Sequence, residues 1–175
     1  MRSFFPFLAT TLLLCSSTAS AQISIIGNSN ASECYKEAKA DRANTEPCDD
    51  ALAGHTLVGR NLAATYVNRA VVRTNGGSFE RALRDLEHAE SLRPEFGEIY
   101  ASRGNVYFYQ SSFDAALAEH DRGIAVGMKK LFAAHYNRGL TLEQLGRIEE
   151  AKEAYRQSIA LVPEFGPAKA RLSTL

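Results

Sequence analysis

The chain has 175 residues and no net formal charge, because 20 Lys and Arg residues balance 20 Asp and Glu residues. This balance excludes nucleic acid as a main partner, since binding to a phosphate backbone requires a surplus of Lys and Arg. Hydrophobic residues make up 45% of the chain, which excludes a disordered protein. Beyond the N-terminal segment no uncharged apolar stretch reaches the ~18 residues of a membrane span. We therefore expect one globular domain without a transmembrane helix.

Residues 1–21 have the three parts of a secretory signal peptide. A basic start precedes the apolar run 4–14, and the Ala-Ser-Ala sequence at 19–21 forms a cleavage motif. The apolar run is too short for a membrane anchor. The pattern predicts export, to the periplasm of a bacterium. A lipid anchor on Cys15 is the alternative, although a lipoprotein motif has a small residue where Leu14 stands.

Removal of the signal peptide leaves two cysteines, Cys34 and Cys48. Two cysteines in an exported chain most simply form a disulfide, which we predict here. Closure of a loop of about 15 residues stabilises a fold by roughly 3 kcal/mol. A metal site or a redox pair is the competing interpretation. Further ligands at metal-binding spacing and a Cys-x-x-Cys motif are both absent from the sequence.

An internal repeat organises the rest of the chain, in units at 63–96, 97–131 and 132–165. Small residues recur at intervals of 34 and 35 residues, and an apolar residue precedes the second set by three positions. The first and third units end in a Pro-Glu-Phe sequence. The middle unit instead ends in Gly-Met-Lys-Lys at 127–130, with one inserted residue and no proline.

Each unit predicts two helices joined by a short turn. In the third unit we expect helices at 132–145 and 148–161, the second of which ends before Pro163 because proline cannot continue a helix. We expect the side chains of Ser78 and Ser112 to cap the second helices of the first two units. The recurrent small residues allow two antiparallel helices to approach closely.

These units resemble tetratricopeptide repeats. That family has an aromatic residue at position four, small residues at positions eight and twenty, an aromatic residue at position twenty-four and proline at position thirty-two. The sequence departs from this pattern at Met128 and His135. The resemblance implies an all-α fold, an α-solenoid of antiparallel helix pairs. It implies packing between helices for Tyr66, Ala70, Ala82, Tyr100, Gly104, Ala116, Gly139, Ala151 and Tyr155.

A solenoid needs modified ends, because each end would otherwise expose an apolar face. We predict a flexible lead-in at 22–31 and a disulfide-stapled N-terminal cap at 32–62. Within this cap we expect a short first helix at 32–40 and a second helix at 49–58, by analogy with the repeats. At the other end, residues 166–175 predict a C-terminal capping helix.

The sequence offers little support for an enzyme. No nucleophile elbow, phosphate-binding loop or dinucleotide fingerprint occurs. His120 and His135 stand where the repeat has packing residues, and the acidic pairs at 49–50 and 149–150 start predicted helices, where carboxylates complement the helix dipole. We therefore predict no catalytic residue, no metal site and no cofactor.

The resemblance implies that the first helices of the units line a concave groove, which binds peptides or partner helices in the family. The groove positions hold mostly apolar and aromatic residues, of a kind that accepts an extended or helical peptide. Some of them could instead pack between repeats. The expected groove residues are Val67, Thr74, Glu98, Ala101, Asn105, Phe108, Tyr109, Tyr136, Leu140 and Glu143.

Two further columns recur with the repeat. Asn68, Ser102 and Asn137 form a candidate ladder for a peptide backbone, or satisfy backbone groups between helices. Arg69, Arg103 and Arg138 form an arginine column. This column could bind an acidic partner, although we favour bridges to acidic residues of the neighbouring helices, such as Asp85 and Glu119. Valines replace the first-repeat Lys and Asn with which some members grip a chaperone's C-terminal carboxylate.

From these features we expect a non-catalytic adaptor that binds a protein or peptide partner. A self-associating assembly protein of the envelope is the second hypothesis, so homo-oligomers remain open. A cell-wall hydrolase, or an accessory to one, is the third and weakest. The sequence does not encode the identity of the partner.

Overall fold

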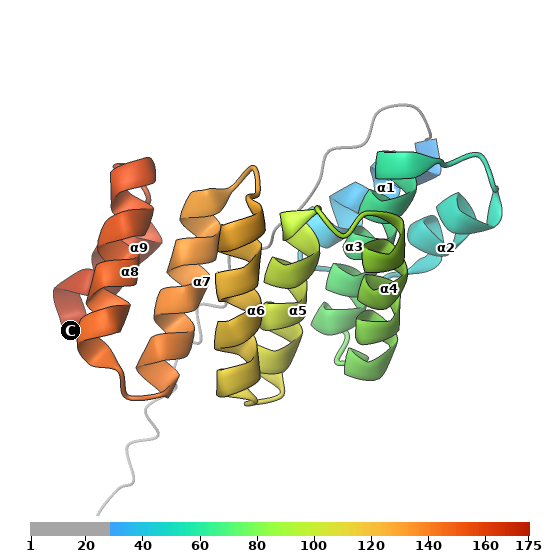
Figure 1. The fold of residues 1–175 in the computed structure, drawn as a ribbon. Coiled ribbons are helices and arrows are strands. Elements are labelled where there is room, and N and C mark those ends of the chain that lie inside the picture. The colour runs from blue at the N-terminus through green and yellow to red at the C-terminus, as the bar shows by residue number, and fades with distance from the viewer. Residues whose placement is uncertain (1–28) are drawn as a thin grey trace, which may run out of the picture.

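The computed structural model describes residues 29–175, and these form helices without any strand. The helices stand side by side in a row, each antiparallel to the next within a pair (Figure 1). Three pairs, α3 with α4, α5 with α6 and α7 with α8, make up the middle of the row. The bounds are α1 Ser29–Lys39, α2 Glu46–Ala53, α3 Gly59–Asn75, α4 Phe79–Leu92, α5 Gly97–Tyr109, α6 Phe113–Val126, α7 Leu131–Gln144, α8 Ile148–Leu161 and α9 Gly166–Thr174.

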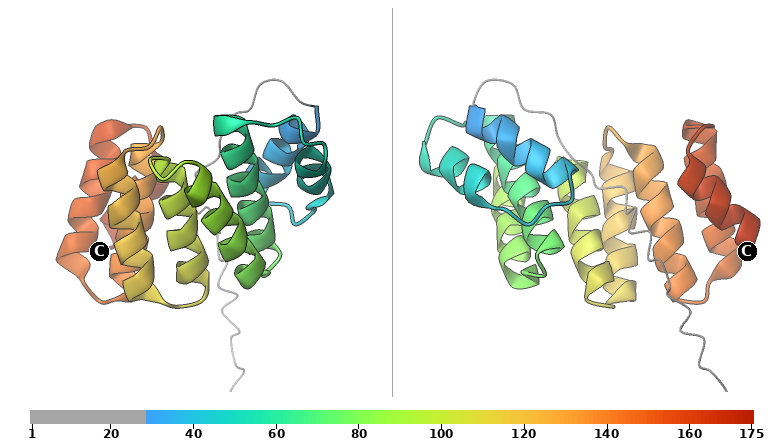
Figure 2. Two further views of the ribbon diagram at one scale, coloured as in Figure 1. Left: turned by 45° about the vertical axis from the view of Figure 1, so that its right-hand side comes forward. Right: turned by 180° about the vertical axis from the view of Figure 1, so that it is seen from behind.

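The all-α solenoid predicted from the repeat is confirmed. The α1–α2 pair covers one end of the row and α9 the other, as seen from both sides in Figure 2. One core cluster runs from Ala31 of α1 through the first pair to Val106 of α5, and a second extends from Leu117 of α6 to Ala168 of α9. The core is therefore linear, and each pair buries its apolar side chains against its neighbours.

Small residues at the eighth repeat position let the two helices of a pair touch. A Cβ atom on Gly104 would lie 2.5 Å from two atoms of the His120 ring. A Cβ atom on Gly139 would lie 2.5 Å from Cε1 of Tyr155. Both rings are fully buried, so neither can move aside. The helix spacing thus depends on the absence of a side chain at these two positions.

The N-terminal cap contains the predicted disulfide between Cys34 and Cys48, with an S–S distance of 2.09 Å. Both residues are buried beside Val71 and Val72 of α3. The disulfide therefore joins α1 to α2 and holds both on the first repeat. The cap reaches only to residue 58, because α3 begins at Gly59 rather than at residue 63.

The predicted bounds of the cap helices are wrong by several residues. The expected helix at 49–58 lies at 46–53, and the expected helix at 32–40 lies at 29–39. Pro47 lies in the first turn of α2, where its missing N–H costs nothing. At the other end Gly54 closes the helix by donating its N–H to Asp50 O, and Val58 is already extended.

The predicted serine caps of α4 and α6 are absent. Neither Ser78 nor Ser112 makes a side-chain capping bond. Their backbone N–H groups instead donate to Arg73 O and Tyr107 O, at 2.8 and 2.9 Å. Arg147 makes the same bond to Leu142 O in the third pair, at 2.9 Å, without a hydroxyl group. The turn is therefore held by the main chain, and the serine side chains are not needed.

The predicted signal peptide at 1–21, the alternative lipid anchor at Cys15 and residues 22–28 of the predicted lead-in lie outside the described residues. Residues 29–31 of the expected lead-in belong to α1. Within the described range, no helix combines the length and apolar character needed to cross a membrane.

Candidate partner-binding face

The first helices of the three pairs form one face of the molecule, which we call the concave face. Helix α5 contacts both α3 and α7, whereas each second helix contacts the first helix of the next pair. The first helices are thus closer together than the second helices, and the row curves toward them. Figure 2 shows α3, α5 and α7 in succession along this row.

A polar row crosses this face between α5 and α7. Asn137 Nδ2 donates to Asn105 Oδ1 at 2.9 Å, which joins the two helices. Ser102 lies one turn before Asn105, and its Oγ is buried without a hydrogen-bond partner. Asn68, the first member of the expected ladder, is fully buried on α3. The repeat thus places the ladder residues on one face. Asn137 donates its hydrogen bond to Asn105, which is one of the expected groove residues.

Two expected groove residues belong to the hydrophobic core. Val67 is fully buried in the cluster that joins the cap to the first two pairs. Tyr136 packs on the rings of Tyr155 and Phe165, with centroids 5.7 and 5.2 Å away. Leu140 packs half-buried against the same C-terminal cluster. Part of the apolar surface of a first helix packs within its own pair, and part lines the concave face. Val67, Tyr136 and Leu140 belong to the part that packs within the core.

Glu143, expected in the groove, instead anchors the C-terminal cap. It accepts a hydrogen bond from the Tyr155 hydroxyl, and Arg171 Nε of α9 donates to it at 3.0 Å. A second bond from Arg171 makes the pair bidentate. Its carboxylate is therefore engaged by α8 and α9 and does not face a partner.

The remaining groove residues differ in exposure. Tyr109 is the most accessible, at 40% of its surface, and its ring meets Phe108 edge-on at 6.1 Å. Ala101 is buried, and Thr74 donates its hydroxyl to Ala70 O of its own helix at 2.7 Å. The accessible part of the predicted groove therefore lies around the C-terminal end of α5.

The arginine column bridges to acidic residues of neighbouring helices, as favoured, within the pair for Arg69 and to the preceding pair for Arg138. Arg69 donates to Asp85 at 2.7 and 3.0 Å, and Arg138 pairs with Asp121 at 2.6 Å. Arg103 lies 3.8 Å from Glu119, its expected partner. Arg69 also bonds Asp49 of α2 at 2.7 Å, so this carboxylate ties the cap to the first pair and does more than complement a helix dipole.

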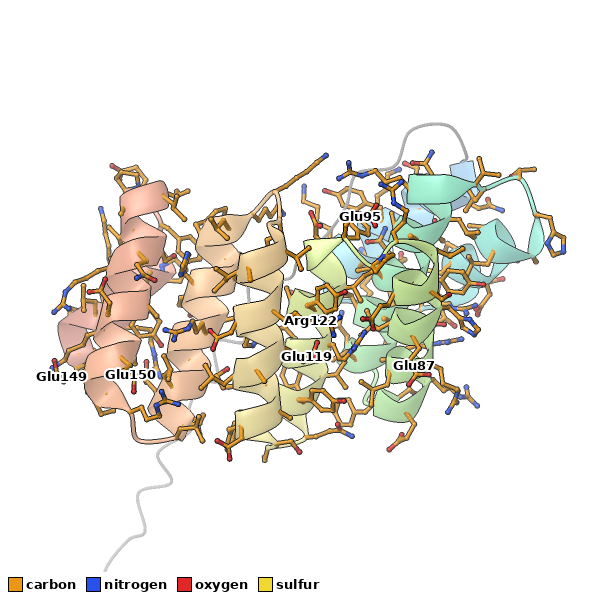
Figure 3. The ribbon with its side chains drawn as sticks, in the orientation of Figure 1. Glu87, Glu95, Glu119, Arg122, Glu149 and Glu150 are labelled. Atoms are coloured by element: carbon orange, nitrogen blue, oxygen red, sulfur yellow. A yellow bond between two sulfur atoms is a disulfide. The ribbon has the colours of Figure 1, made fainter. Side chains whose placement is uncertain are left out.

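Sequence reasoning missed Glu90 as the centre of a charged cluster on the second-helix side. It accepts hydrogen bonds from Arg103, Arg122 and the Tyr100 hydroxyl. Burial opposes its ionisation, but the bonds from Arg103 prevail and lower the pKa of Glu90. Figure 3 shows Arg122 and Glu119 together on α6, on the side that faces α4. The repeat pattern gave no signal for Glu90, because the contact crosses from one unit to the next.

His120 is buried and His135 is half-buried within the fold. His120 is fully buried, and neither ring nitrogen has a hydrogen-bond partner. Burial, and then the nearby charge of Arg138, lowers the pKa of His120 to about 3. The ring is thus neutral at pH 7. Among residues 29–175 no three His, Cys, Asp or Glu side chains gather in an arrangement that could hold a metal ion.

Residues 132–165 match the model of the tetratricopeptide repeat family. The third unit is therefore a tetratricopeptide repeat. The chain as a whole is similar in structure to the first TPR of Spaghetti (RPAP3) bound to the HSP90 peptide SRMEEVD, with a TM-score of 0.61 and 20% identity over 69% of this chain and 94% of that one. It is also similar to MamA, with a TM-score of 0.63 and 20% identity over 85% of this chain and 82% of MamA.

Two relatives from Arabidopsis thaliana share sequence with this chain. The TPR repeat-containing thioredoxin TDX is 29% identical over 112 residues, which are 63% of this chain and 29% of the relative. Hsp70-Hsp90 organizing protein 3 is 30% identical over 64 residues, which are 37% of this chain and 12% of the relative. The chain thus spans less than a third of either relative. The shared fold is generally a non-catalytic scaffold for protein interactions.

Proposed function

We propose that this protein is a non-catalytic adaptor of the bacterial cell envelope, which holds a peptide segment of a partner protein on the concave face. The polar row of Ser102, Asn105 and Asn137 carries the proposal. Its side chains are largely buried, from 3% exposure at Ser102 and Asn137 to 8% at Asn105, so a peptide reaches the row at Asn105. An extended peptide presents N–H and C=O groups that such side chains can bind. Tyr109, at the end of the same helix, offers an exposed aromatic surface for a peptide side chain.

The similar proteins support a peptide as the partner. The residues of this chain indicate a peptide whose chemistry differs from that of a chaperone peptide. One similar structure holds an HSP90 peptide, and one relative is named as an Hsp70-Hsp90 organizing protein. In this chain Val67 and Val71 occupy the first-repeat positions of the residues that grip a chaperone's C-terminal carboxylate, and both are buried. The concave face therefore recognises a partner through main-chain hydrogen bonds and apolar contact.

The proposal is tested with peptides selected from a random phage-displayed library on the purified protein. We expect the selected peptides to compete with one another and to bind about tenfold more weakly to the Asn105→Ala and Tyr109→Ala variants, as at interface positions worth more than 1 kcal/mol. Leu92→Ala is the matched control, because Leu92 at the end of α4 is 41% exposed against 40% for Tyr109. Equal affinities of all four proteins, measured by calorimetry, would place the binding surface elsewhere.

We also propose that the protein reaches its partner after export. The buried disulfide between Cys34 and Cys48 supports an oxidising compartment such as the periplasm. Mass spectrometry of the protein recovered from an envelope fraction tests this. The proposal expects an N-terminus at Gln22 and no free thiol. A mass that includes a diacylglycerol on Cys15 would instead establish the lipid anchor, and an intact Met1 with reduced cysteines would reject export.

A further inference from the structure

A pocket of about 430 Å³ opens at the edge of the solenoid where the loops between units meet. Its walls come from three segments that are far apart in the sequence. These are Arg60 in the first turn of α3, the α4–α5 loop with the first turn of α5 at 93–98, and the α6–α7 loop at 127–129. Figure 3 places Glu95 of the α4–α5 loop at this edge. Glu98, expected in the groove, lines this pocket.

The pocket carries an excess of positive charge. Arg60 and Lys129 are exposed, and neither is ion-paired with an acidic side chain of residues 29–175. Arg93 pairs with Glu95 at 2.5 Å, but 39% and 60% of these two side chains are exposed, so solvent weakens the pair. The carboxylate of Glu98 is buried and accepts the backbone N–H of Lys129 at 3.3 Å. Two cationic side chains are therefore free to bind an anion.

The pocket also has an apolar wall. Phe96 is 6% exposed, and the Arg60 guanidinium lies over its ring, 5.2 Å from the centroid. This stacking fixes the guanidinium at the rim and leaves its N–H groups for a ligand. Met128 adds a flexible apolar side chain on the opposite loop. A ligand that fits must combine an anionic group with an apolar group.

The unusual end of the second unit builds this site. Met128 stands where the first and third units have proline, and Gly127 adopts a φ of 88°, which favours glycine. A Cβ atom on Gly97 would lie 2.3 Å from Gly127 O, so the α6–α7 loop presses directly on the start of α5. This approach brings the Lys129 amide to Glu98. The departure from the repeat therefore forms one wall of a charged pocket.

We propose that this pocket binds an acidic side chain of a partner polypeptide together with an adjacent aliphatic residue. The carboxylate lies between Arg60 and Lys129, and the aliphatic group packs on Phe96 and Met128. This site is separate from the polar row at Asn105, so it goes beyond the proposed function and can fail or succeed on its own. A protein adaptor with two such sites would bind a peptide and select for acidic residues near it.

The test is a nuclear magnetic resonance titration of the isotope-labelled protein with N-acetyl-glutamyl-leucine amide. We expect the amide signals of Gly97, Gly127 and Lys129 to shift, and that of Asn105 to stay in place. The glutaminyl analogue should bind about fivefold more weakly, because it lacks the charge that attracts two exposed cations. This comparison uses the unmodified protein and does not depend on the folding of any variant.

The Arg60→Gln/Lys129→Gln double variant should bind the acidic probe about fivefold more weakly than wild type. Arg84→Gln, an exposed arginine of α4, is the control and should leave the affinity unchanged. Three results would overturn the proposal: equal binding of both probes, shifts confined to the concave face, or tighter binding of inorganic phosphate than of the acidic probe at the same amides.

Discussion

At the residue scale, the contact between Gly139 and the Tyr155 ring fixes the separation of α7 and α8. A Cβ atom at this position would lie 2.5 Å from Cε1 of the ring. Tyr155 is fully buried, and its hydroxyl is held by Glu143. The first pair uses Ala70 and Leu86 at the equivalent positions, and both are buried in one cluster. The residue at this position of the first helix must therefore be small, because the side chain that faces it on the second helix is bulky.

Gly139→Ala should therefore destabilise the protein by about 1–3 kcal/mol through overpacking. Gly166→Ala is the control, since apart from its chain neighbours and its own helix no atom lies within 4 Å of the added Cβ, and Gly166 is also helical. There the lower entropy of the unfolded chain should stabilise the fold by about 0.5–1 kcal/mol. Urea denaturation measures both values. Stabilisation of similar size in the two variants would show that α7 and α8 are not in contact at Gly139.

The buried ring of His120 makes stability depend on pH. Its pKa of about 3 in the folded protein, lowered by burial and then by Arg138, lies below the ordinary value of 6.5. Between these values the unfolded chain binds a proton that the folded chain does not. Stability should thus fall as pH decreases, by about 2 kcal/mol from this group at pH 5. His120→Phe should remove that part of the pH dependence, as measured by urea denaturation at pH 7.5 and 5. An unchanged slope would contradict the assignment. Burial also lowers the pKa of His135, so a smaller dependence should remain.

At the element scale, charged side chains join neighbouring helices in addition to the apolar core. Asp85 of α4 accepts from Arg69 at 2.7 Å and from Arg73 at 2.6 Å, and only 2% of its side chain is exposed. Asp49 of α2 lies against the same two arginines. This group therefore connects the N-terminal cap, α3 and α4, while Arg171 and Glu143 connect α9 to the opposite end.

Asp85→Asn should cost about 3 kcal/mol, because it leaves two largely buried guanidinium groups without their closest carboxylate. Asp121→Asn is the matched control, since Asp121 is half exposed and its pair with Arg138 should contribute less than about 1 kcal/mol. Thermal or urea unfolding distinguishes the two. Equal losses would show that the buried cluster is no more important than a surface ion pair.

The disulfide is the second device that holds the cap in place. Replacement of Cys34 and Cys48 by alanine should lower stability by about 3 kcal/mol, as expected for closure of a loop of about 15 residues. The wild-type protein in a reducing buffer should unfold at the same urea concentration as the double variant. If the double variant and the oxidised wild type unfold together, the bond does not support the fold.

At the scale of the whole molecule, the repeat made most of the fold predictable. The third unit was expected at 132–145 and 148–161 and is found at 131–144 and 148–161. The cap does not repeat, so alignment of Cys48 with the apolar residue that starts each second helix placed α2 three residues late. Proline and glycine inside the segment, not its resemblance to a repeat, decide where α2 begins and ends.

The site was less predictable than the fold. Period and spacing identify which residues lie on a first helix, but Val67 and Tyr136 pack inside the pair and Tyr109 faces solvent. The burial of a side chain depends on its contacts with neighbouring units, and its position within one unit does not specify these contacts. Glu143 was misassigned for the same reason, because its partner Arg171 belongs to a helix outside the repeat. The loop-edge pocket arises where the repeat is broken, so the repeat pattern could not indicate it.

Paramagnetic relaxation enhancement locates the bound peptide on the protein. A library-selected peptide with a spin label at its centre is added to the isotope-labelled protein. We expect strong broadening of the Asn105 and Tyr109 amide signals on the concave face, with little effect at Leu92 of α4 and Arg156 of α8. Broadening at Leu92 and Arg156, with the Asn105 and Tyr109 signals intact, would contradict the concave face as the binding site.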